Sequence, residues 1–500
     1  MLSISDPAPF APCPAPFNMA EYVLAAGAAT PDKIALEIVR ATGAERWSYA
    51  RLIAAVRGTG TGLLRAGLQP GDRILLRLGN SVAFPVAYLG AIAAGLVPVP
   101  TSTQLTGPEI ARMAALINPK LVLASAGVAL PDHPAPVLDE AALRPFHDLP
   151  PCDWGRGDPD RLGYIIFTSG SGGSPRAVAH AHRAVWARRM MWTGWYDLRP
   201  DDRVLHAGAF NWTYTLGTGL MDPWAIGATA LIPQSGAPLP LMLKRFDATI
   251  FAAAPGVYRQ ILKDEAPFSL SHLRHGLSAG EELSDKVRQS WTARTGCPIY
   301  EALGMSECST YASESPGRPA GLFPQAGRKL AVLGPDGQPN LRGTEGVLAI
   351  HQSDPGLMLG YLGTDGLTRP LSAGYFLTGD RAVMAENGAV HYLGRDDDMM
   401  NAGGYRVSPL EVESAFADYP AITEIACTEV AVKPEVTIIA AFYTGQELPH
   451  ETLAAFAAER LARYKQPRLY VHCDSLPKGP NGKLSRKTLR SAYEARNGHA

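Results

Sequence analysis

Short apolar segments alternate with longer amphipathic segments along the first half of the chain. Two amphipathic segments, 49–66 and 108–117, are preceded by Ser48 and Thr106, residue types that cap the N-termini of helices. This alternation predicts an α/β fold built in layers, with largely parallel sheets. The strand-like segments are 34–39, 73–78, 120–124, 163–167, 203–205, 229–232 and 249–252.

The pattern changes in the second half of the chain. Between residues 331 and 392, short strand-like runs are separated by the turn sequences Gly-Pro-Asp-Gly (334–337) and Glu-Asn-Gly (386–388), which predicts a β-rich segment. A compact tail that mixes helical and strand-like patterns follows residues 394–398. Because 500 residues exceed what one core supports, we expect a large N-terminal domain, residues 1–394, and a small mobile α+β C-terminal domain, residues 395–500.

Composition excludes several classes of protein. The chain has 46 Lys and Arg residues against 47 Asp and Glu, a net charge of −1, and no basic block that indicates nucleic acid. The six cysteines form no C-x-x-C pair or Cys/His cluster, which argues against zinc and disulfide frameworks and fits a reducing compartment. The first residues lack the basic-then-apolar pattern of a signal peptide. We therefore expect a cytoplasmic protein.

One segment, 82–100, is free of charge and superficially similar to a membrane span. It contains three prolines and two glycines, and much of its apolar character comes from alanine. A buried helix followed by a short strand explains this composition better than a membrane-spanning helix. We therefore expect no insertion into a membrane.

A loop of glycine, serine and threonine follows the strand-like segment 163–167. Small residues expose backbone N–H groups and hydroxyls, and Arg176 adds a positive charge at the loop's end, so the loop is suited to bind phosphates. The alternative is a flexible surface loop, because the Walker pattern is absent. The loop residues proposed to contact phosphate are Thr168, Ser169, Gly170, Ser171, Gly172 and Gly173.

This loop resembles the T-S-G-S-T-G-x-P-K signature of the adenylate-forming superfamily, which includes acyl-CoA synthetases, peptide-synthetase adenylation domains and luciferases. Four further segments resemble the other signatures of that superfamily in the same order, and the resemblance spans roughly residues 20–490. The pattern is most similar to benzoate–CoA ligases and medium-chain acyl-CoA synthetases. The four segments are LGMSE (303–307), YFLTGD (375–380), GRDDD through GGYRVSPLEVE (394–413) and PKGPNGK (477–483).

The resemblance implies an ATP-dependent acid–CoA ligase that first makes an acyl-adenylate. Lys483 is implied to neutralise charge shared by the carboxylate and the α-phosphate. Glu307 is implied to hold Mg²⁺ and Ser306 to bond the α-phosphate. Asp380 and Arg395 are implied to bind the ribose. Weaker assignments place Gly280, Glu281, Glu301 and Leu303 around the adenine, with Glu301 as partner of its amino group.

The second half-reaction, transfer of the acyl group to coenzyme A, is implied to need rotation of the C-terminal domain. The hinge is expected at Asp397. Gly403 and Gly404 are expected to line the channel for the pantetheine arm, where absent side chains leave room. The alternative for these two glycines is an ordinary hairpin turn.

Three residues depart from the superfamily's pattern. Gly172 stands where threonine is usual, Arg176 replaces lysine, and Leu303 replaces an aromatic residue expected to pack on adenine. These changes bear on the affinity for ATP. Gly172 and Leu303 also favour one alternative, a non-catalytic nucleotide- or acyl-binding protein on the same scaffold. The residues Glu307, Asp380, Arg395 and Lys483 are nevertheless all retained.

The segment 210–219 (FNWTYTLGTG) falls where the superfamily builds its acyl pocket, with Gly304 beside it. No Lys or Arg occurs between residues 207 and 232, so a second carboxylate of the substrate would lack a partner there. Trp212 and Tyr214 are expected to shorten the pocket and offer ring faces, unless they only pack the core. We therefore expect a small apolar monocarboxylic acid, aromatic or cyclic rather than medium-chain.

Besides the non-catalytic binding protein, two other interpretations of the chain stay open. One is a medium-chain fatty acyl-CoA synthetase, and one is an adenylating enzyme that loads a carrier protein, against which the Y-K-x-P sequence at 464–467 argues. His180 and His182 could be metal ligands, but they match an H-x-H of acyl-CoA synthetases near the acyl site. The expected partners are a carboxylic acid, ATP and coenzyme A, in a monomer or a homodimer.

Overall fold

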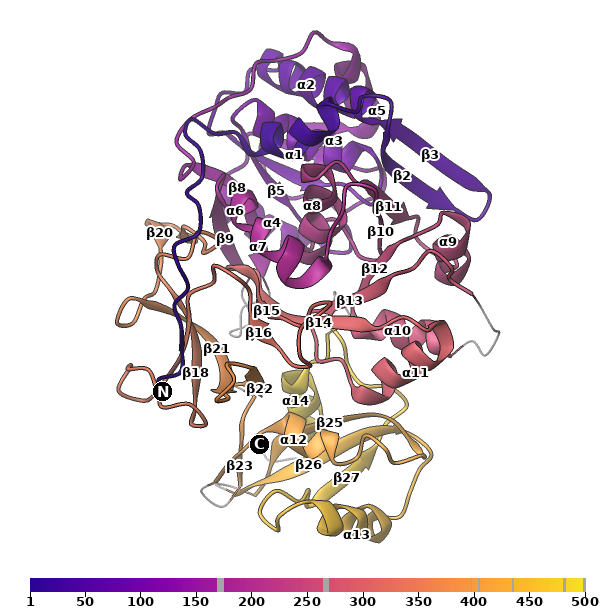
Figure 1. Ribbon diagram of the computed structural model, residues 1–500, viewed down its shortest axis with the longest axis vertical. Coiled ribbons are helices and arrows are strands. Elements are labelled where there is room, and N and C mark those ends of the chain that lie inside the picture. Colours follow the sequence, from indigo (N-terminus) through magenta and orange to yellow (C-terminus); the bar gives the residue numbers. More distant parts are fainter. Residues whose placement is uncertain are drawn as a thin grey trace.

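The computed structural model describes residues 1–168, 175–263, 269–396, 398–402, 405–433, 436–479 and 483–497. Figure 1 shows layers of helices and sheets formed by the first part of the chain and a smaller body, coloured orange to yellow, formed by the last part. The expected mixed α/β fold, with a large N-terminal and a small C-terminal domain, is confirmed.

A small parallel sheet near the N-terminus has the strand order β5-β4-β6-β7, formed by β5 (Val97–Pro100), β4 (Arg73–Arg77), β6 (Leu121–Ala124) and β7 (Val137–Asp139). Helix α3 (Ala83–Ala93) precedes β5 and is buried on almost every side, which explains why it carries no charge. The prediction of a buried helix and a short strand for residues 82–100 is confirmed.

The two predicted helix caps are also present. Helix α2 (Tyr49–Arg65) begins after Ser48, whose hydroxyl accepts the N–H of Arg51 at 3.3 Å. Helix α4 (Gly107–Ile117) begins with a capping box between Thr106 and Glu109.

The largest sheet has the strand order β16-β15-β14-β13-β12-β10-β11-β2-β3. Its interior pairs, from β14 to β2, are parallel, and its two edges are closed by antiparallel strands. Ligands bind at the carboxyl ends of strands in such sheets, so the ends of β13 and β14 mark where a site is expected. The strands are β2 (Ile34–Arg40), β3 (Gly43–Ser48), β10 (Arg203–His206), β11 (Thr229–Pro233), β12 (Ile250–Ala253), β13 (His275–Ala279), β14 (Ile299–Met305), β15 (Ser309–Ser313) and β16 (Phe323–Pro324).

Two antiparallel sheets complete the N-terminal domain. One has the order β20-β19-β9-β8, and the other, β1-β17-β18-β21-β22, confirms the predicted β-rich segment. Their strands are β8 (Leu162–Thr168), β9 (Arg176–Ala181), β19 (Gly360–Gly363), β20 (Gly366–Thr368), β1 (Ile4–Ser5), β17 (Leu330–Leu333), β18 (Glu345–His351), β21 (Tyr375–Met384) and β22 (Val390–Arg395).

The C-terminal domain has its own core. In strand β25 (Ile422–Lys433), Cys427 belongs to the same buried cluster as Val412 and Leu453, which lie on helices, and Phe416, which lies in a turn. The other elements are β23 (Met400–Ala402), β24 (Tyr405–Val407), α12 (Pro409–Ser414), β26 (Val436–Gly445), α13 (His450–Arg460), β27 (Leu469–His472) and α14 (Arg486–Asn497).

The remaining helices all belong to the N-terminal domain, and α9 (Leu239–Arg245), α10 (Pro255–Leu262) and α11 (Asp285–Thr295) lie along its right flank in Figure 1. Across the described ranges, no helix is both long enough and apolar enough to span a bilayer. The other helices of this group are α1 (Met19–Ala28), α5 (Glu140–Leu143), η1 (Arg144–Asp148), α6 (Ala184–Ala187), α7 (Arg189–Met191), η2 (Trp192–Tyr196), η3 (Thr215–Met221) and α8 (Asp222–Ala225).

Candidate active site

A large cleft of about 2230 Å³ lies between the N-terminal and the C-terminal domain. Most of the residues predicted to bind nucleotide or acid line it, although they come from distant parts of the sequence. The predicted residues on its walls are Thr168, Arg176, Trp212, Gly280, Glu281, Glu301, Leu303, Gly304, Ser306, Glu307, Asp380, Arg395 and Lys483.

Eight of the predicted residues lie outside the described part of the chain. They are Ser169, Gly170, Ser171, Gly172 and Gly173 of the phosphate loop, Asp397 of the hinge, and Gly403 and Gly404 of the expected channel.

Glu307 lies in the turn between β14 and β15 and is only 7% exposed. Its carboxylate accepts a hydrogen bond from the hydroxyl of Tyr361 at 2.8 Å. The guanidinium of Arg176 stands over the ring of the same tyrosine, 5.2 Å from its centre. The last residue of the phosphate loop and the acidic residue of the turn therefore share one neighbour, Tyr361.

The backbone of Ser306 is fixed by His180 on β9. The ring Nε2 of His180 lies 2.7 Å from the carbonyl oxygen of Ser306, and because a carbonyl only accepts, Nε2 carries the hydrogen. Burial lowers the pKa of His180 to about 4, so the ring is neutral at pH 7. His182 accepts the N–H of Met19 through Nδ1 at 3.1 Å. One nitrogen of each histidine is thus bonded to the backbone. Among the described residues, neither histidine belongs to a group of three or more His, Cys, Asp or Glu side chains that could hold a metal ion.

Asp380 and Arg395 face each other as register partners on β21 and β22. Arg395 donates to Asp380 Oδ1 at 3.0 Å, and Tyr311 of β15 donates to Oδ2 at 2.9 Å. Burial raises the pKa of Asp380, and Arg395 and Tyr311 oppose that rise. Gly379 has a φ of +76°, and a Cβ there would lie 2.9 Å from Arg395 Nη2, so any other residue would be strained at this position and would crowd the Arg395 side chain.

Lys483 reaches the same cleft from the C-terminal domain. Its Cε lies 3.6 Å from the position that a Cβ on Gly280 would occupy. Lys483 is exposed to the water of the cleft, yet the surrounding protein lowers its pKa by desolvation, against the attraction of Glu281 and Asp380. The ammonium group therefore stands among acidic residues of the N-terminal domain.

Trp212 lies on Gly280, the residue after β13. A Cβ on Gly280 would be 2.8 Å from Trp212 Cζ2, and its φ is +98°. Tyr214 meets the Trp212 ring edge-on at 5.2 Å, but it is buried and its hydroxyl donates to the carbonyl of Leu277 at 3.0 Å. Trp212 thus forms the wall of the cleft, whereas the structure places Tyr214 beneath that wall and not on it.

Two carboxylates on the expected adenine side of the cleft, Glu301 and Glu281, already contact other residues of the protein. Glu301 accepts the N–H of Leu283 at 2.8 Å and pairs with Arg288 at 3.2 Å. Burial nevertheless raises the pKa of Glu301 to about 8. Glu281 lies 3.6 Å from Arg259. Both carboxylates therefore already have partners before any nucleotide binds.

Several contributors to the site were missed in the sequence. Tyr311 and Tyr361 have no local signal, because a tyrosine in a strand is ordinary. Arg188 does have a local signal. It lies in the apolar run AVWARRMMW (184–192), where a buried charge requires a partner. That partner is Asp222, at 2.5 Å.

Comparison with known proteins agrees with this geometry. Residues 24–362 match the family model described as AMP-binding enzyme, and residues 411–483 match that of the AMP-binding enzyme C-terminal domain. The chain therefore belongs to the AMP-binding enzyme family. Within it, the chain is an AMP-forming acyl-CoA synthetase, that is, an acid–thiol ligase that binds ATP.

Two curated relatives and one crystal structure illustrate the similarity. The benzoate–CoA ligase of Thauera aromatica is 30% identical, over 94% of this chain and 92% of that protein. The mitochondrial acyl-coenzyme A synthetase ACSM3 of Mus musculus is 27% identical, over 89% and 84%. A benzoate CoA ligase from Burkholderia xenovorans LB400 superposes with a TM-score of 0.83 at 27% identity, over 95% and 100%.

Proposed function

We propose that this protein joins a small apolar monocarboxylic acid, aromatic or cyclic, to coenzyme A through an acyl-adenylate. The observation that carries the proposal is the meeting of Lys483 from one domain with Glu307 and Asp380 from the other, in a cleft whose wall includes Trp212. Charge stabilisation and positioning are what transfer at a phosphate requires. These residues supply both.

In the adenylation step, Asp380 is suited to accept the ribose hydroxyls, because it is fixed by Arg395 and Tyr311. Lys483 stands where the carboxylate of the acid would approach the α-phosphate, and its charge would offset the negative charge that develops there. Ser306, whose carbonyl is tied to His180, would present its own polar groups to the same phosphate.

Glu307 fits a role in holding Mg²⁺. Mg²⁺ in nucleotide sites is usually held by one or two carboxylates and the phosphates, and Glu307 is a buried carboxylate at the cleft with one hydrogen-bond donor on Oε1. When bound, Mg²⁺ would neutralise charge on the phosphates. The protein's part is to hold the Glu307 carboxylate in place through Tyr361.

For the thioester step, we propose a domain boundary at the end of β22, one residue after the predicted break between 394 and 395, with Asp397 as the hinge. Strand β22 ends at Arg395, and helix α12, which packs on β25, begins at Pro409. Rotation about this connection would withdraw Lys483 and let Gly403 and Gly404 border the path of the pantetheine arm.

The proposed class of acid follows from the residues that form the wall of the cleft. Trp212 covers Gly280 and offers a ring face while limiting depth. Arg188, a basic residue that donates to Thr218 of η3, is already neutralised by Asp222. It is therefore not free to pair with the second carboxylate of a dicarboxylic acid, and an apolar ring is favoured over a second charge beside η3.

The test is a comparison of benzoate, hexanoate, acetate and malonate with ATP and Mg²⁺, with and without coenzyme A. We expect AMP, pyrophosphate and thioester, with the highest kcat/KM for benzoate. Pyrophosphate without thioester would indicate a carrier-loading enzyme, and neither product would indicate a binding protein. Preference for hexanoate would make the chain a medium-chain synthetase, and preference for acetate or malonate would refute the argument from Trp212.

A further inference from the structure

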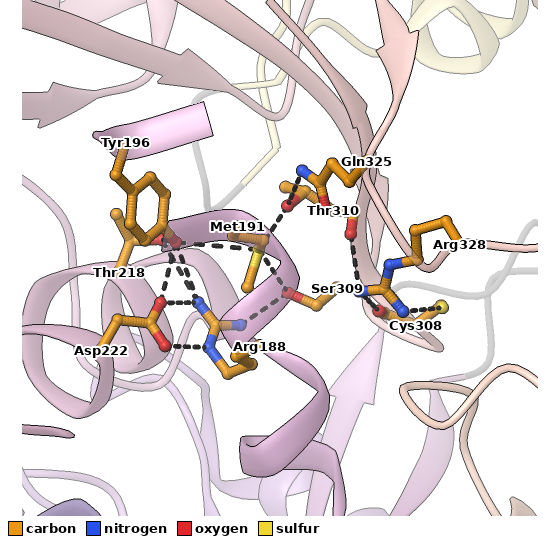
Figure 2. Close-up of polar contacts among 10 residues, drawn as sticks. All are labelled: Arg188, Met191, Tyr196, Thr218, Asp222, Cys308, Ser309, Thr310, Gln325 and Arg328. Carbon is orange, nitrogen blue, oxygen red and sulfur yellow. Dashed lines mark hydrogen bonds and ion pairs between the residues drawn. The ribbon is translucent and has the colours of Figure 1, made fainter. Parts of the chain in front are cut away.

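Two buried arginines, Arg188 and Arg328, donate hydrogen bonds to the chain where the turn after β14 leads into β15. This turn carries Glu307. Arg328 donates to the carbonyl oxygens of Cys308 at 3.2 Å and Thr310 at 2.8 Å. Arg188 approaches the residue between them and donates to the hydroxyl of Ser309 at 2.6 Å. Figure 2 shows the two guanidinium groups on either side of this segment.

The segment needs such support because its backbone is strained. Ser309 has a φ of +64°, in the left-handed region that residues other than glycine seldom adopt. A strained residue of this kind persists only where its surroundings fix it. Ser309 lies two residues after Glu307, so a change in the Ser309 backbone would move the Glu307 carboxylate.

Arg188 is itself fixed by the segment expected to form the acyl pocket. Its guanidinium pairs with both oxygens of Asp222, at 2.8 and 2.5 Å, and donates to Thr218 of η3 at 3.4 Å. A Cβ on Gly217 would lie 2.1 Å from Arg188 Cζ. Gly217 therefore leaves the space in which the guanidinium lies against η3.

Little empty space separates Arg188 from the turn. The cavity lined by Arg188, Thr213, Leu216, Ser306 and Ser309 measures only about 10 Å³, roughly the room for one water molecule. A shift of η3 or of Arg188 would therefore be passed to Ser306 and Ser309 by direct contact.

We propose that Arg188 is a positioning residue that couples η3, at the acid-binding wall, to the turn that presents Ser306 and Glu307. The proposal rests on the function proposed above. It adds how the acid-binding wall at η3 and the turn with Ser306 and Glu307 keep fixed positions relative to each other. Arg188 is buried and is not among the residues that line the cleft. It acts through the hydroxyl of Ser309, while Asp222 balances its charge.

Removing Arg188 outright would leave the charge of Asp222 buried without an opposite charge, although Tyr196 would still donate to it at 2.8 Å. The sharper variants are therefore Ser309→Ala and Ser309→Gly. Both remove the hydroxyl and keep the Arg188–Asp222 pair, and glycine also tolerates the left-handed backbone. Arg188→Lys keeps a positive charge but cannot donate to Asp222 and Ser309 in the same fork geometry. Ser313→Ala is the matched control, because Ser313 is a buried serine of the same strand whose hydroxyl donates elsewhere, to the carbonyl of Gly194 at 2.8 Å.

Two measurements distinguish a positioning role of Arg188 from a contribution to the stability of the fold alone. The first is the Mn²⁺ affinity of the enzyme in the presence of a non-hydrolysable ATP analogue, followed by electron paramagnetic resonance. The second is the rate of adenylation against the rate of thioester formation from synthetic acyl-adenylate. For both Ser309 variants and Arg188→Lys we expect Mn²⁺ affinity to fall about 5-fold or more and adenylation about 10-fold, with thioester formation within 2-fold of wild type.

Wild-type Mn²⁺ affinity in Ser309→Gly would overturn the proposal, because the hydroxyl contact would then be dispensable. An equal loss in Ser313→Ala would also overturn it, because the effect would then be general destabilisation. If the unmodified protein forms no adenylate from any acid, the proposed function fails; the Mn²⁺ measurement still decides the role of Arg188.

Discussion

Arg259 of α10 lies 3.5 Å from Glu424 of β25 and 3.6 Å from Glu281, so one guanidinium joins the two domains across the cleft. Glu424 also accepts the ammonium of Lys478 at 2.8 Å, within the C-terminal domain. This bridge exists in the arrangement in which Lys483 stands over Gly280. It therefore favours the geometry suited to adenylation over any rotated geometry.

Glu424→Gln should weaken this bridge and shift the balance between the two half-reactions. Such partly exposed pairs contribute about 1 kcal/mol or less, so we expect adenylation to slow about 2- to 5-fold while thioester formation from acyl-adenylate is unchanged or faster. Glu429→Gln is the control, since Glu429 lies on the same strand and pairs with Arg490 of its own domain at 3.1 Å. Equal effects of the two substitutions on adenylation would show that the bridge does not bias the domains.

Lys483→Ala should reduce adenylation about 1000-fold or more, because it removes the one oriented positive charge proposed to act at the α-phosphate. Thioester formation from a presynthesised acyl-adenylate should stay within a few-fold of wild type, because the charge is needed only at the α-phosphate. Lys487→Ala, an exposed lysine four residues later, is the control. A similar loss in both half-reactions would assign Lys483 a structural role instead.

Trp212→Gly should open the wall of the cleft over Gly280. We expect the ratio of kcat/KM for hexanoate to that for benzoate to rise about 10-fold or more, because a longer chain would enter the space of the indole. Tyr214→Phe keeps the ring under the wall and removes the hydroxyl that donates to the carbonyl of Leu277, so it should leave that ratio unchanged. If Tyr214→Phe changed the preference as much as Trp212→Gly, the assignment of these two residues to wall and support would be wrong.

Glu301 makes the stability of the N-terminal domain depend on pH. Its pKa is raised to about 8 in the folded protein, from an ordinary value near 4.5 in the unfolded chain. The folded state therefore holds a proton that the unfolded state has released, and stability falls as pH rises from about 4.5 to about 8. From pH 6 to pH 8, we expect Glu301 to lower the free energy of unfolding by about 1–2 kcal/mol.

Glu301→Gln mimics the protonated acid at every pH and should remove that part of the slope. Urea unfolding of both proteins at pH 6 and pH 8 measures it. Identical pH dependence in the two proteins would mean that Arg288 keeps Glu301 ionised throughout.

Local signals in the sequence predicted much of the fold. Ser48 and Thr106 cap the helices that were predicted to follow them, because a cap depends only on residues a few positions away. The strand-like segments end within one or two residues of the observed strands. The resemblance placed Glu307, Asp380, Arg395 and Lys483, which the structure brings to one cleft.

Contacts between distant residues were beyond such signals. Arg188 and Asp222 belong to different helical segments, and Arg259 and Glu424 to different domains, so no spacing in the sequence connects them. Trp212 and Tyr214 look equivalent in the sequence, yet the turn into η3 directs one ring to the cleft and the other to the core. Only the path of the backbone distinguishes them.

The buried pair of Arg188 and Asp222 also restricts how this protein can evolve. Loss of either partner alone would leave an uncompensated charge in the interior, which costs about 3–5 kcal/mol, a large part of the stability of an ordinary domain. Replacing both with apolar residues of similar volume is often neutral, but it requires two codons to change together. Single-nucleotide routes away from this pair pass through poorly folded intermediates, so descendants of this gene should keep both residues or neither.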